Sequence, residues 1–192
     1  MNISSALFQG TKILKNNSII TADIDAEILM AKAINKDRKY ILLNSAQKVD
    51  TEALNIYEKL IENRSNRKPV AYLINKKFFW KTEFYITEKT LIPRPDTELI
   101  IENTLNLTKH KNHLRILDVG IGSGCILLSI LKERQNFYGT GIDISKNCLN
   151  ISKINAKILH VGSRLKLFKS NVDKFNLGKY DLIISNPPYI NN

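Results

Sequence analysis

The sequence has 192 residues, and 29 lysine and arginine residues against 18 acidic residues give a formal net charge of +11. This length fits one ordinary domain, or one domain with a small companion, and 43% hydrophobic with 24% charged residues excludes a disordered or collagen-like chain. No apolar run approaches the roughly 20 residues that span a bilayer, and the first residues lack the pattern of a secretory signal peptide. We therefore expect a cytoplasmic protein without a membrane segment.

Residues 1–68 are predicted to form a small helical domain. Apolar residues recur at helical spacing in three segments: one from Ile3 to Leu14, one through Ile24, Ile28 and Ala31 after a cap at Asp23, and one from Ala53 to Ile61 after Asp50. Residues 69–90 change character, because Phe78–Trp80 and Phe84–Thr87 are aromatic and β-branched and lie three residues apart. This pattern predicts a β-hairpin that links two domains.

Residues 91–192 are predicted to form an α/β domain. Two prolines, Pro93 and Pro95, precede an apolar helix that begins near Glu98. From Leu114 onward the predicted strands 115–119, 137–143, 165–169 and 180–185 alternate with helices 124–134 and 145–158. This alternation is typical of a parallel sheet with helices on its faces.

The first candidate site is the glycine-rich turn between strand 115–119 and the following helix, with the sequence Gly120-Ile121-Gly122-Ser123-Gly124. Glycine can adopt a positive φ, and without a Cβ it lets a ligand approach the backbone at the beginning of a helix. The spacing differs from the dinucleotide fingerprint, because Cys125 stands where a glycine is needed, and no Gly-Lys-Ser/Thr follows that would make a P-loop.

A second candidate is Asp143, at the end of the next predicted strand. A carboxylate at this position can accept hydrogen bonds from the two hydroxyl groups of a ribose, and its alternative role is to cap the following helix.

The third candidate is Asn186-Pro187-Pro188-Tyr189, directly after the last predicted strand. The prolines make the loop rigid and expose its carbonyl groups. The Asn186 side-chain oxygen and the Pro187 carbonyl can accept both hydrogens of a planar NH2 group while Tyr189 packs on its plane. The segment therefore favours a site for an amide or an amine.

Together these three segments resemble the class I S-adenosylmethionine-dependent methyltransferases that act on planar NH2 groups. The segment Leu91-Ile92-Pro93-Arg94-Pro95-Asp96-Thr97-Glu98 is similar to the characteristic sequence of the release factor glutamine methyltransferases known as PrmC or HemK. This resemblance covers essentially the whole chain.

The resemblance implies a Rossmann-like class I methyltransferase sheet, with S-adenosylmethionine as cofactor and peptide chain release factors as partners. The reaction would be methyl transfer to the side-chain amide nitrogen of the glutamine in their Gly-Gly-Gln motif, and residues 1–68 would help to recognise them. Asn186, Pro187 and Tyr189 would be catalytic and would bind the substrate together with Pro188. The cofactor would contact Gly120, Ile121, Gly122, Ser123, Gly124, Asp143, Asn171, Val172 and Asn186.

The sequence departs from the family at Asn171, where an acid is usual, and at Asn75 and Lys81, where glycine is frequent. The family sheet has seven strands, of which only four are predicted here, so we expect the C-terminal strands to be missing and the chain to be part of a longer enzyme.

Two alternatives remain open: a nucleic-acid methyltransferase that modifies an exocyclic base amine, or an inactive remnant that still binds partners. Direct nucleic-acid binding is left open, because lysine supplies 22 of the 29 positive charges and Asn and Ile are also abundant, which indicates compositional bias. No metal is expected, since Cys125, Cys148, His110 and His113 have no further ligands at suitable spacing.

Overall fold

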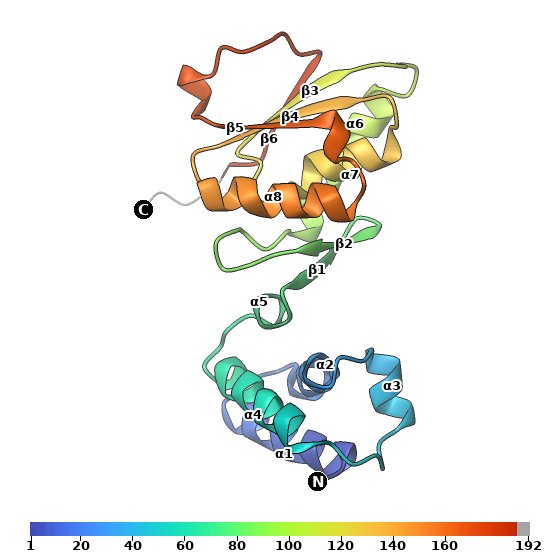
Figure 1. Cartoon of the computed structure of the whole chain (residues 1–192), viewed down its shortest axis with the longest axis vertical. Coiled ribbons are helices and arrows are strands. Elements are labelled where there is room, and N and C mark those ends of the chain that lie inside the picture. The colour runs from blue at the N-terminus through green and yellow to red at the C-terminus, as the bar shows by residue number, and fades with distance from the viewer. Residues whose placement is uncertain (188–192) are drawn as a thin grey trace. The chain divides into compact units, whose positions relative to one another are not determined.

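The computed structural model describes residues 1–187. The chain divides into two compact units, Met1–Asn75 and Lys76–Asn192, which are described separately (Figure 1).

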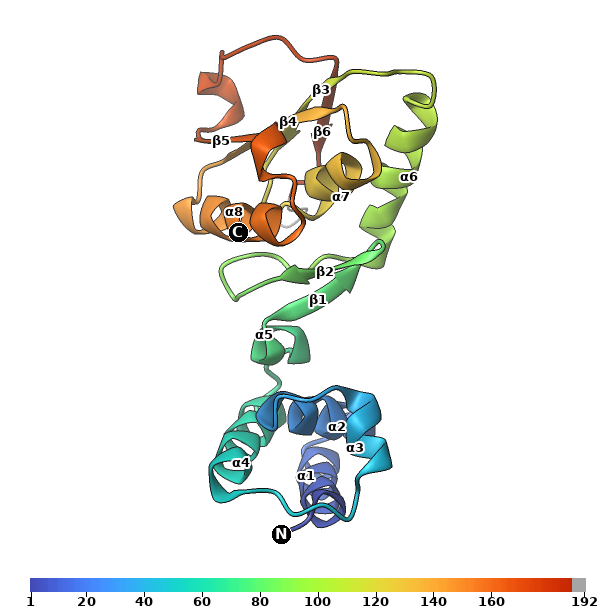
Figure 2. The same ribbon diagram turned by 45° about the vertical axis from the view of Figure 1, so that its right-hand side comes forward.

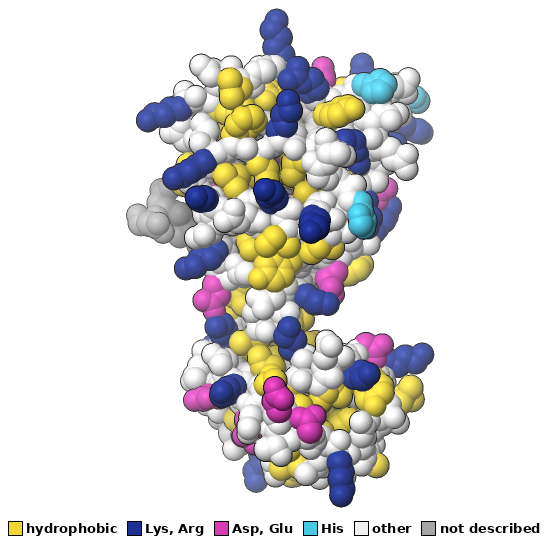
Figure 3. All heavy atoms as spheres, in the orientation of Figure 1, with side chains coloured by type: hydrophobic (Ala, Val, Ile, Leu, Met, Phe, Trp, Pro, Cys, Tyr) yellow, Lys and Arg dark blue, Asp and Glu magenta, His cyan; other side chains and the backbone are white. Residues whose placement is uncertain are grey.

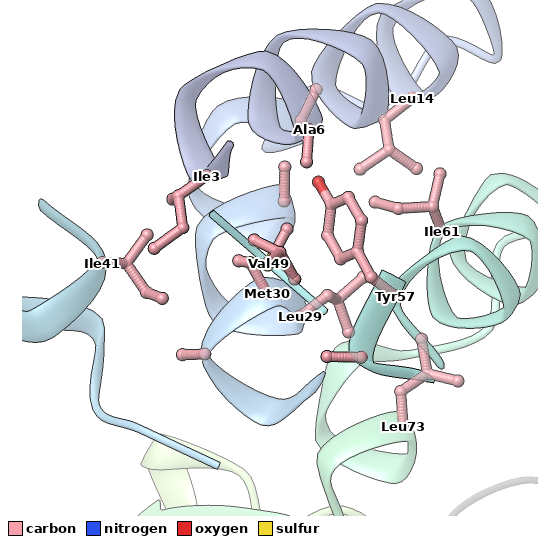
Figure 4. Close-up of a cluster of buried hydrophobic side chains, with 14 of the residues drawn as sticks. Ile3, Ala6, Leu14, Leu29, Met30, Ile41, Val49, Tyr57, Ile61 and Leu73 are labelled. Carbon is pink, nitrogen blue, oxygen red and sulfur yellow. The ribbon is translucent and has the colours of Figure 1, made fainter. Parts of the chain in front are cut away.

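The first unit is helical, and its helices are α1 (Ile3–Asn16), α2 (Ala22–Ala33), α3 (Arg38–Leu43), α4 (Thr51–Ser65) and α5 (Val70–Ile74). Its core is formed by side chains from α1, α2 and α4, including Leu14, Leu29 and Tyr57, which point toward one another (Figure 4). Side chains of Asn2, Asp37 and Asp50 accept hydrogen bonds from backbone N–H groups at the beginnings of α1, α3 and α4.

Helix α2 differs from the sequence prediction. It begins at Ala22 with Thr21 as its N-cap, so Asp23 is not the cap, and Ile24 is 48% exposed. The reason is that α2 packs against α1, α3, α4 and α5, which buries residues around its circumference and not along one stripe. Asp25 lies in this interior and forms an ion pair with Arg64, with 2.7 Å between the Nε and Oδ2 atoms.

The second unit begins with the expected hairpin, formed by β1 (Lys76–Phe79) and β2 (Thr82–Tyr85). The predicted three-residue connection was wrong, because Phe79 pairs with Thr82 and only Trp80 and Lys81 form the turn. Trp80 adopts a positive φ of 52°, which a two-residue hairpin turn requires.

A four-stranded parallel sheet follows, with the order β5-β4-β3-β6 within the described residues. Its strands are β3 (Arg115–Val119), β4 (Tyr138–Asp143), β5 (Leu165–Lys169) and β6 (Leu182–Ser185), and its helices are α6 (Glu98–Leu107), α7 (Cys125–Glu133) and α8 (Lys146–Ile158). Three short 3-10 helices, η1 (Pro95–Thr97), η2 (Gly162–Arg164) and η3 (Val172–Lys174), complete the unit. This architecture confirms the predicted α/β fold.

Helices α7 and α8 lie on one face of the sheet (Figure 2). Helix α7 and the turn before it approach β4 closely, because a Cβ at Gly139 would lie 2.9 Å from the Leu127 side chain of α7 and a Cβ at Gly141 would overlap Ile121 of the turn. The strands run in register, with Val119 beside both Ile142 and Ser185. Their carboxyl ends therefore share one edge of the sheet, and the loops that leave these ends lie together.

Candidate active site

All predicted site residues that the structure describes lie at this carboxyl edge. The glycine turn follows β3, Asp143 ends β4, Asn171 and Val172 follow β5, and Asn186 with Pro187 follows β6. Pro188 and Tyr189, which were predicted to bind substrate, lie outside the described residues.

The glycine turn has a backbone conformation that residues other than glycine rarely adopt. Gly120, Gly122 and Gly124 have φ values of 77°, 57° and 82°. The N–H groups of Gly120 and Ile121 both donate to the carbonyl oxygen of Ile142, at 2.9 and 3.0 Å. The turn is thus fastened to the end of β4.

Two of the three glycines border open space. A Cβ at Gly120 would meet nothing within 4 Å, and one at Gly122 would meet only a backbone oxygen at 3.9 Å. A Cβ at Gly124, by contrast, would lie 2.7 Å from the Leu128 side chain, so this glycine allows close packing. Ile121 and Ser123 are 5% and 4% exposed. The open side of the turn is therefore formed by backbone, and a ligand can approach it at Gly120 and Gly122.

Asp143 joins the glycine turn to α8. Its Oδ2 accepts a hydrogen bond from the N–H of Gly122 at 3.0 Å, and its Oδ1 accepts one from the N–H of Ser145 at 2.8 Å. The N-cap of α8 is Ser145, so Asp143 is not the residue that caps this helix. A carboxylate has about four lone-pair sites, so two such bonds leave capacity for two ligand hydroxyl groups.

Asp118, in β3, is a buried acid whose role the sequence analysis did not consider. It is 2% exposed, and burial raises the pKa of its carboxyl group to about 7, opposed by a hydrogen bond from the Leu127 backbone and reinforced by the negative charge of Asp143. The signal in the sequence was an acid inside an apolar strand, two residues before the first glycine of the turn.

This raised pKa predicts a specific dependence of stability on pH. The unfolded chain loses the Asp118 proton near pH 4 and the folded chain only near pH 7. The contribution of this protonated group to stability is therefore fully present below about pH 4 and is lost as the pH rises toward 7. Between pH 5 and pH 8 the free energy of unfolding should fall by about 2 to 3 kcal/mol more in the wild type than in an Asp118→Asn variant. Urea unfolding at the two pH values measures the free energy of unfolding of both proteins. An equal fall in this free energy for the wild type and the variant would contradict the prediction.

Asn186 is held by the segment that precedes α6. Its Nδ2 donates a hydrogen bond to the Thr97 hydroxyl oxygen at 3.1 Å, across 89 positions of sequence. Ser185, the last residue of β6, donates from its hydroxyl group to the carbonyl oxygen of Val119 at 3.0 Å. These two bonds fix the beginning of the Asn186-Pro187 loop beside the glycine turn.

Replacing Thr97 with valine should therefore disturb Asn186 with little effect on the fold. Valine has the shape of threonine without the hydroxyl group, so only the hydrogen bond to Asn186 is lost. We expect methyl transfer, the activity that the resemblance implies, to fall about 10-fold, the effect of one hydrogen bond of about 1 kcal/mol or slightly more. Thr97→Ser, which keeps the hydroxyl group, is the matched control, and equal activities of the two variants would show that the bond is unimportant.

Asn171 and Val172 lie next to Asp143, since the N–H of Ser170 donates to the carbonyl oxygen of Asp143 at 3.2 Å. The Asn171 side chain accepts a hydrogen bond from the N–H of Lys174 at 3.1 Å and caps η3, and Val172 is 57% exposed. Asn171 therefore has a local structural role in addition to the predicted contact with a cofactor.

The chain is similar to known proteins over most of its length. Residues 5–74 match the family model of the PrmC N-terminal domain, and residues 95–192 match the methyltransferase small domain. The chain is 36% identical over 193 residues to the release factor glutamine methyltransferase of Clostridium botulinum, covering 99% of this chain and 68% of that protein. This chain belongs to the release factor glutamine methyltransferase family. Its cofactor is accordingly S-adenosylmethionine.

The chain spans about two thirds of the length of these relatives. It is also 36% identical to the release factor glutamine methyltransferase of Buchnera aphidicola, and spans 65% of the length of that protein. Among solved structures, the chain is similar to an RNA methyltransferase from Salinibacter ruber in complex with S-adenosyl-L-homocysteine. The match covers 49% of this chain and 60% of the Salinibacter chain, with 18% identity and a TM-score of 0.43.

The segment Leu91–Glu98 is also connected to the hairpin. The backbone N–H of Trp80 donates to Glu98 at 2.7 Å, and its indole Nε1 donates to Glu133 at 2.8 Å. Lys81 forms an ion pair with the same Glu133. The acid at the end of the segment thus ties the hairpin turn to α6, while Thr97 ties the segment to Asn186.

Within residues 1–187, no group of three or more His, Cys, Asp or Glu side chains could hold a metal ion. No helix in this part of the chain is long and apolar enough to cross a membrane.

Proposed function

We propose that this chain transfers a methyl group from S-adenosylmethionine to the side-chain amide nitrogen of the glutamine in the Gly-Gly-Gln motif of peptide chain release factors. One observation carries this function: Asn186, which begins the family's Asn-Pro-Pro-Tyr segment, is hydrogen-bonded to Thr97 of the family's other characteristic segment, beside the glycine turn. The similarity to release factor glutamine methyltransferases supports the substrate.

The cofactor would lie on the carboxyl edge of the sheet. Gly120 and Gly122 leave space for its methionine part, and Asp143 has lone pairs left for the ribose hydroxyl groups. Asn171 and Val172 would lie near the adenine, with Asn171 able to hydrogen-bond but carrying no charge. When bound, S-adenosylmethionine supplies a methyl group activated by a sulfonium ion.

The chain's contribution to the chemistry would be mainly positional. An amide nitrogen is a poor nucleophile, because its lone pair is delocalised into the carbonyl group, and orientation of reactants can lower a barrier by several kcal/mol. The Asn186 side-chain oxygen and the Pro187 carbonyl would accept the two amide hydrogens. Pro188 and Tyr189 would contact the substrate as the resemblance implies. Asn186 and Pro187 offer no titratable base, so these residues would orient the nitrogen. The proton that the methylated nitrogen gives up would pass to water, and S-adenosylhomocysteine would be released.

The direct test is transfer of labelled methyl from S-adenosylmethionine to a purified bacterial release factor. The matched control is the same release factor with the glutamine of its Gly-Gly-Gln motif changed to alanine. We expect label on the first protein and none on the control. Label on neither protein, or equal label on both, would contradict the proposed function.

A second candidate is methyl transfer to an exocyclic amine of RNA or DNA, and one observation favours it. Residues 144–172 contain six lysine and arginine residues and no acid, and a groove of about 1000 Å³ along α8 and β5 is lined by Lys146, Lys153, Lys157 and Lys169. Figure 3 shows Lys and Arg side chains spread over this face of the second unit. Such a surface attracts a phosphate backbone. Label on RNA or DNA in the same assay, with none on the release factor, would establish this alternative.

The proposed substrate also predicts where the protein works. Because release factors act in translation, we expect the chain in the cytoplasm, and fractionation of cells that produce it would test this.

A further inference from the structure

Asn155 is a fully buried polar residue on α8 that connects two distant segments. Its Oδ1 accepts a hydrogen bond from the backbone N–H of Tyr85 at 2.8 Å, and its Nδ2 donates to the carbonyl oxygens of Tyr85 and Ser123, both at 2.9 Å. Tyr85 ends the hairpin strand β2, and Ser123 belongs to the glycine turn. One side chain therefore joins the hairpin to the turn.

The chemistry of these contacts specifies asparagine. The side chain offers one acceptor group and two donor hydrogens, and all three functions are used. Asparagine is a poor helix former, and burial of a carboxamide without hydrogen bonds is costly, so its presence inside α8 calls for such compensation. Aspartate lacks the two donors, and alanine or leucine would leave three backbone groups without partners.

A second side chain of α8 binds the carbonyl group of Gly122, which precedes that of Ser123 in the turn. Ser152, one turn before Asn155, donates from its hydroxyl group to the carbonyl oxygen of Gly122 at 2.7 Å. Two consecutive carbonyl groups of the turn thus point toward α8. Since the peptide bond is planar and trans, the N–H of Ser123 points away from α8. The orientation of the turn is therefore determined by α8 as well as by the glycines.

We propose that Asn155 is a positioning residue for cofactor binding, which holds the glycine turn in its binding conformation and couples it to the hairpin strand β2. Asn155 acts through the backbone of Ser123 and Tyr85. Its role depends on the assignment of the glycine turn to the cofactor, which is part of the proposed function. Loosening the hairpin at Tyr85 should accordingly weaken the cofactor site, although β2 lies outside the predicted cofactor contacts.

The test compares Asn155→Ala with a control that loses equally many hydrogen bonds elsewhere in the second unit. Arg164 provides it, because its guanidinium group donates to the carbonyl oxygens of Arg134, Phe137 and Leu131 at 2.9, 2.9 and 2.7 Å, at the end of α7 and the beginning of β4, away from the glycine turn. Both variants should lose stability. Binding of S-adenosylhomocysteine, measured by calorimetry at a temperature where circular dichroism shows both variants folded, should weaken about 10- to 100-fold in Asn155→Ala and less than about 3-fold in Arg164→Ala.

Amide hydrogen exchange without cofactor gives a second readout. Exchange at Gly122 and Gly124 should accelerate about 10-fold or more in Asn155→Ala and remain near the wild-type rate in Arg164→Ala. Ser152→Ala, a milder variant that removes only the bond to Gly122, should shift exchange in the same direction by a smaller factor.

Equal exchange at the turn in the Asn155→Ala and Arg164→Ala variants would overturn the positioning role, as would equal losses of affinity. If the wild type binds no S-adenosylhomocysteine, the cofactor assignment fails, and with it the role of Asn155 in cofactor binding. Such a result differs from the failure of release factor methylation alone, in which binding and its dependence on Asn155 persist.

Discussion

Replacing Asn186 with alanine is expected to reduce methyl transfer to the release factor by about 100-fold or more. The variant removes the side-chain oxygen proposed to orient the substrate amide and the Nδ2 group that donates to Thr97. Losses of this size follow when a single group that positions or polarises the reacting atoms is removed. Steady-state kinetics with labelled S-adenosylmethionine measures the loss in kcat/KM.

Two comparisons make this expectation specific. Asn176→Ala changes an exposed asparagine in the same unit and should leave activity unchanged. The Asn186→Ala variant should retain S-adenosylhomocysteine binding much better than methyl transfer, because only one of its proposed contacts is with the cofactor. Full transfer by this variant would contradict the role of Asn186, and a loss confined to cofactor affinity would contradict its role toward the amide.

The second large effect is expected at Asp143, where an alanine variant should weaken S-adenosylhomocysteine binding about 30- to 300-fold. The carboxylate accepts hydrogen bonds from the N–H groups of Gly122 and Ser145, and it is proposed to accept the ribose hydroxyl groups. Its removal takes away charge-assisted bonds to the cofactor and one bond that shapes the turn, each worth about 1 to 3 kcal/mol. Isothermal titration calorimetry measures the affinity directly.

Asp143→Asn separates these two contributions. The amide keeps one acceptor oxygen but not the charge or the second acceptor, so we expect an intermediate loss of affinity. Glu102→Gln neutralises an exposed acid on α6 and serves as the control for the change of net charge. An affinity of Asp143→Ala within about 3-fold of the wild type would show that Asp143 does not hold the cofactor.

The sheet of the second unit could be predicted because its strands and helices carry strong local patterns. The predicted strands 115–119 and 165–169 match β3 and β5. The glycines and Asn186 follow apolar strands, and Asp143 ends one. In a parallel sheet these positions must share one edge, so the location of the site followed from the order of elements.

Features made by contacts between distant residues could not be predicted in this way. The bond between Thr97 and Asn186 spans 89 positions, and the bonds from Asn155 to Tyr85 span 70. Asn155 looks like a surface residue of α8 when the sequence is considered alone. The predicted buried face of α2 was wrong for a related reason, since a helix enclosed on several sides has no single buried face.

The measurement that most directly tests the central proposal is mass spectrometry of the release factor after reaction with this chain and S-adenosylmethionine. Fragmentation of the peptide that contains Gly-Gly-Gln should place one added methyl group on the side-chain nitrogen of the glutamine, and the Asn186→Ala variant should leave that peptide largely unmodified. A methyl group on any other residue, or an unmodified peptide with the wild-type chain, would contradict the proposal.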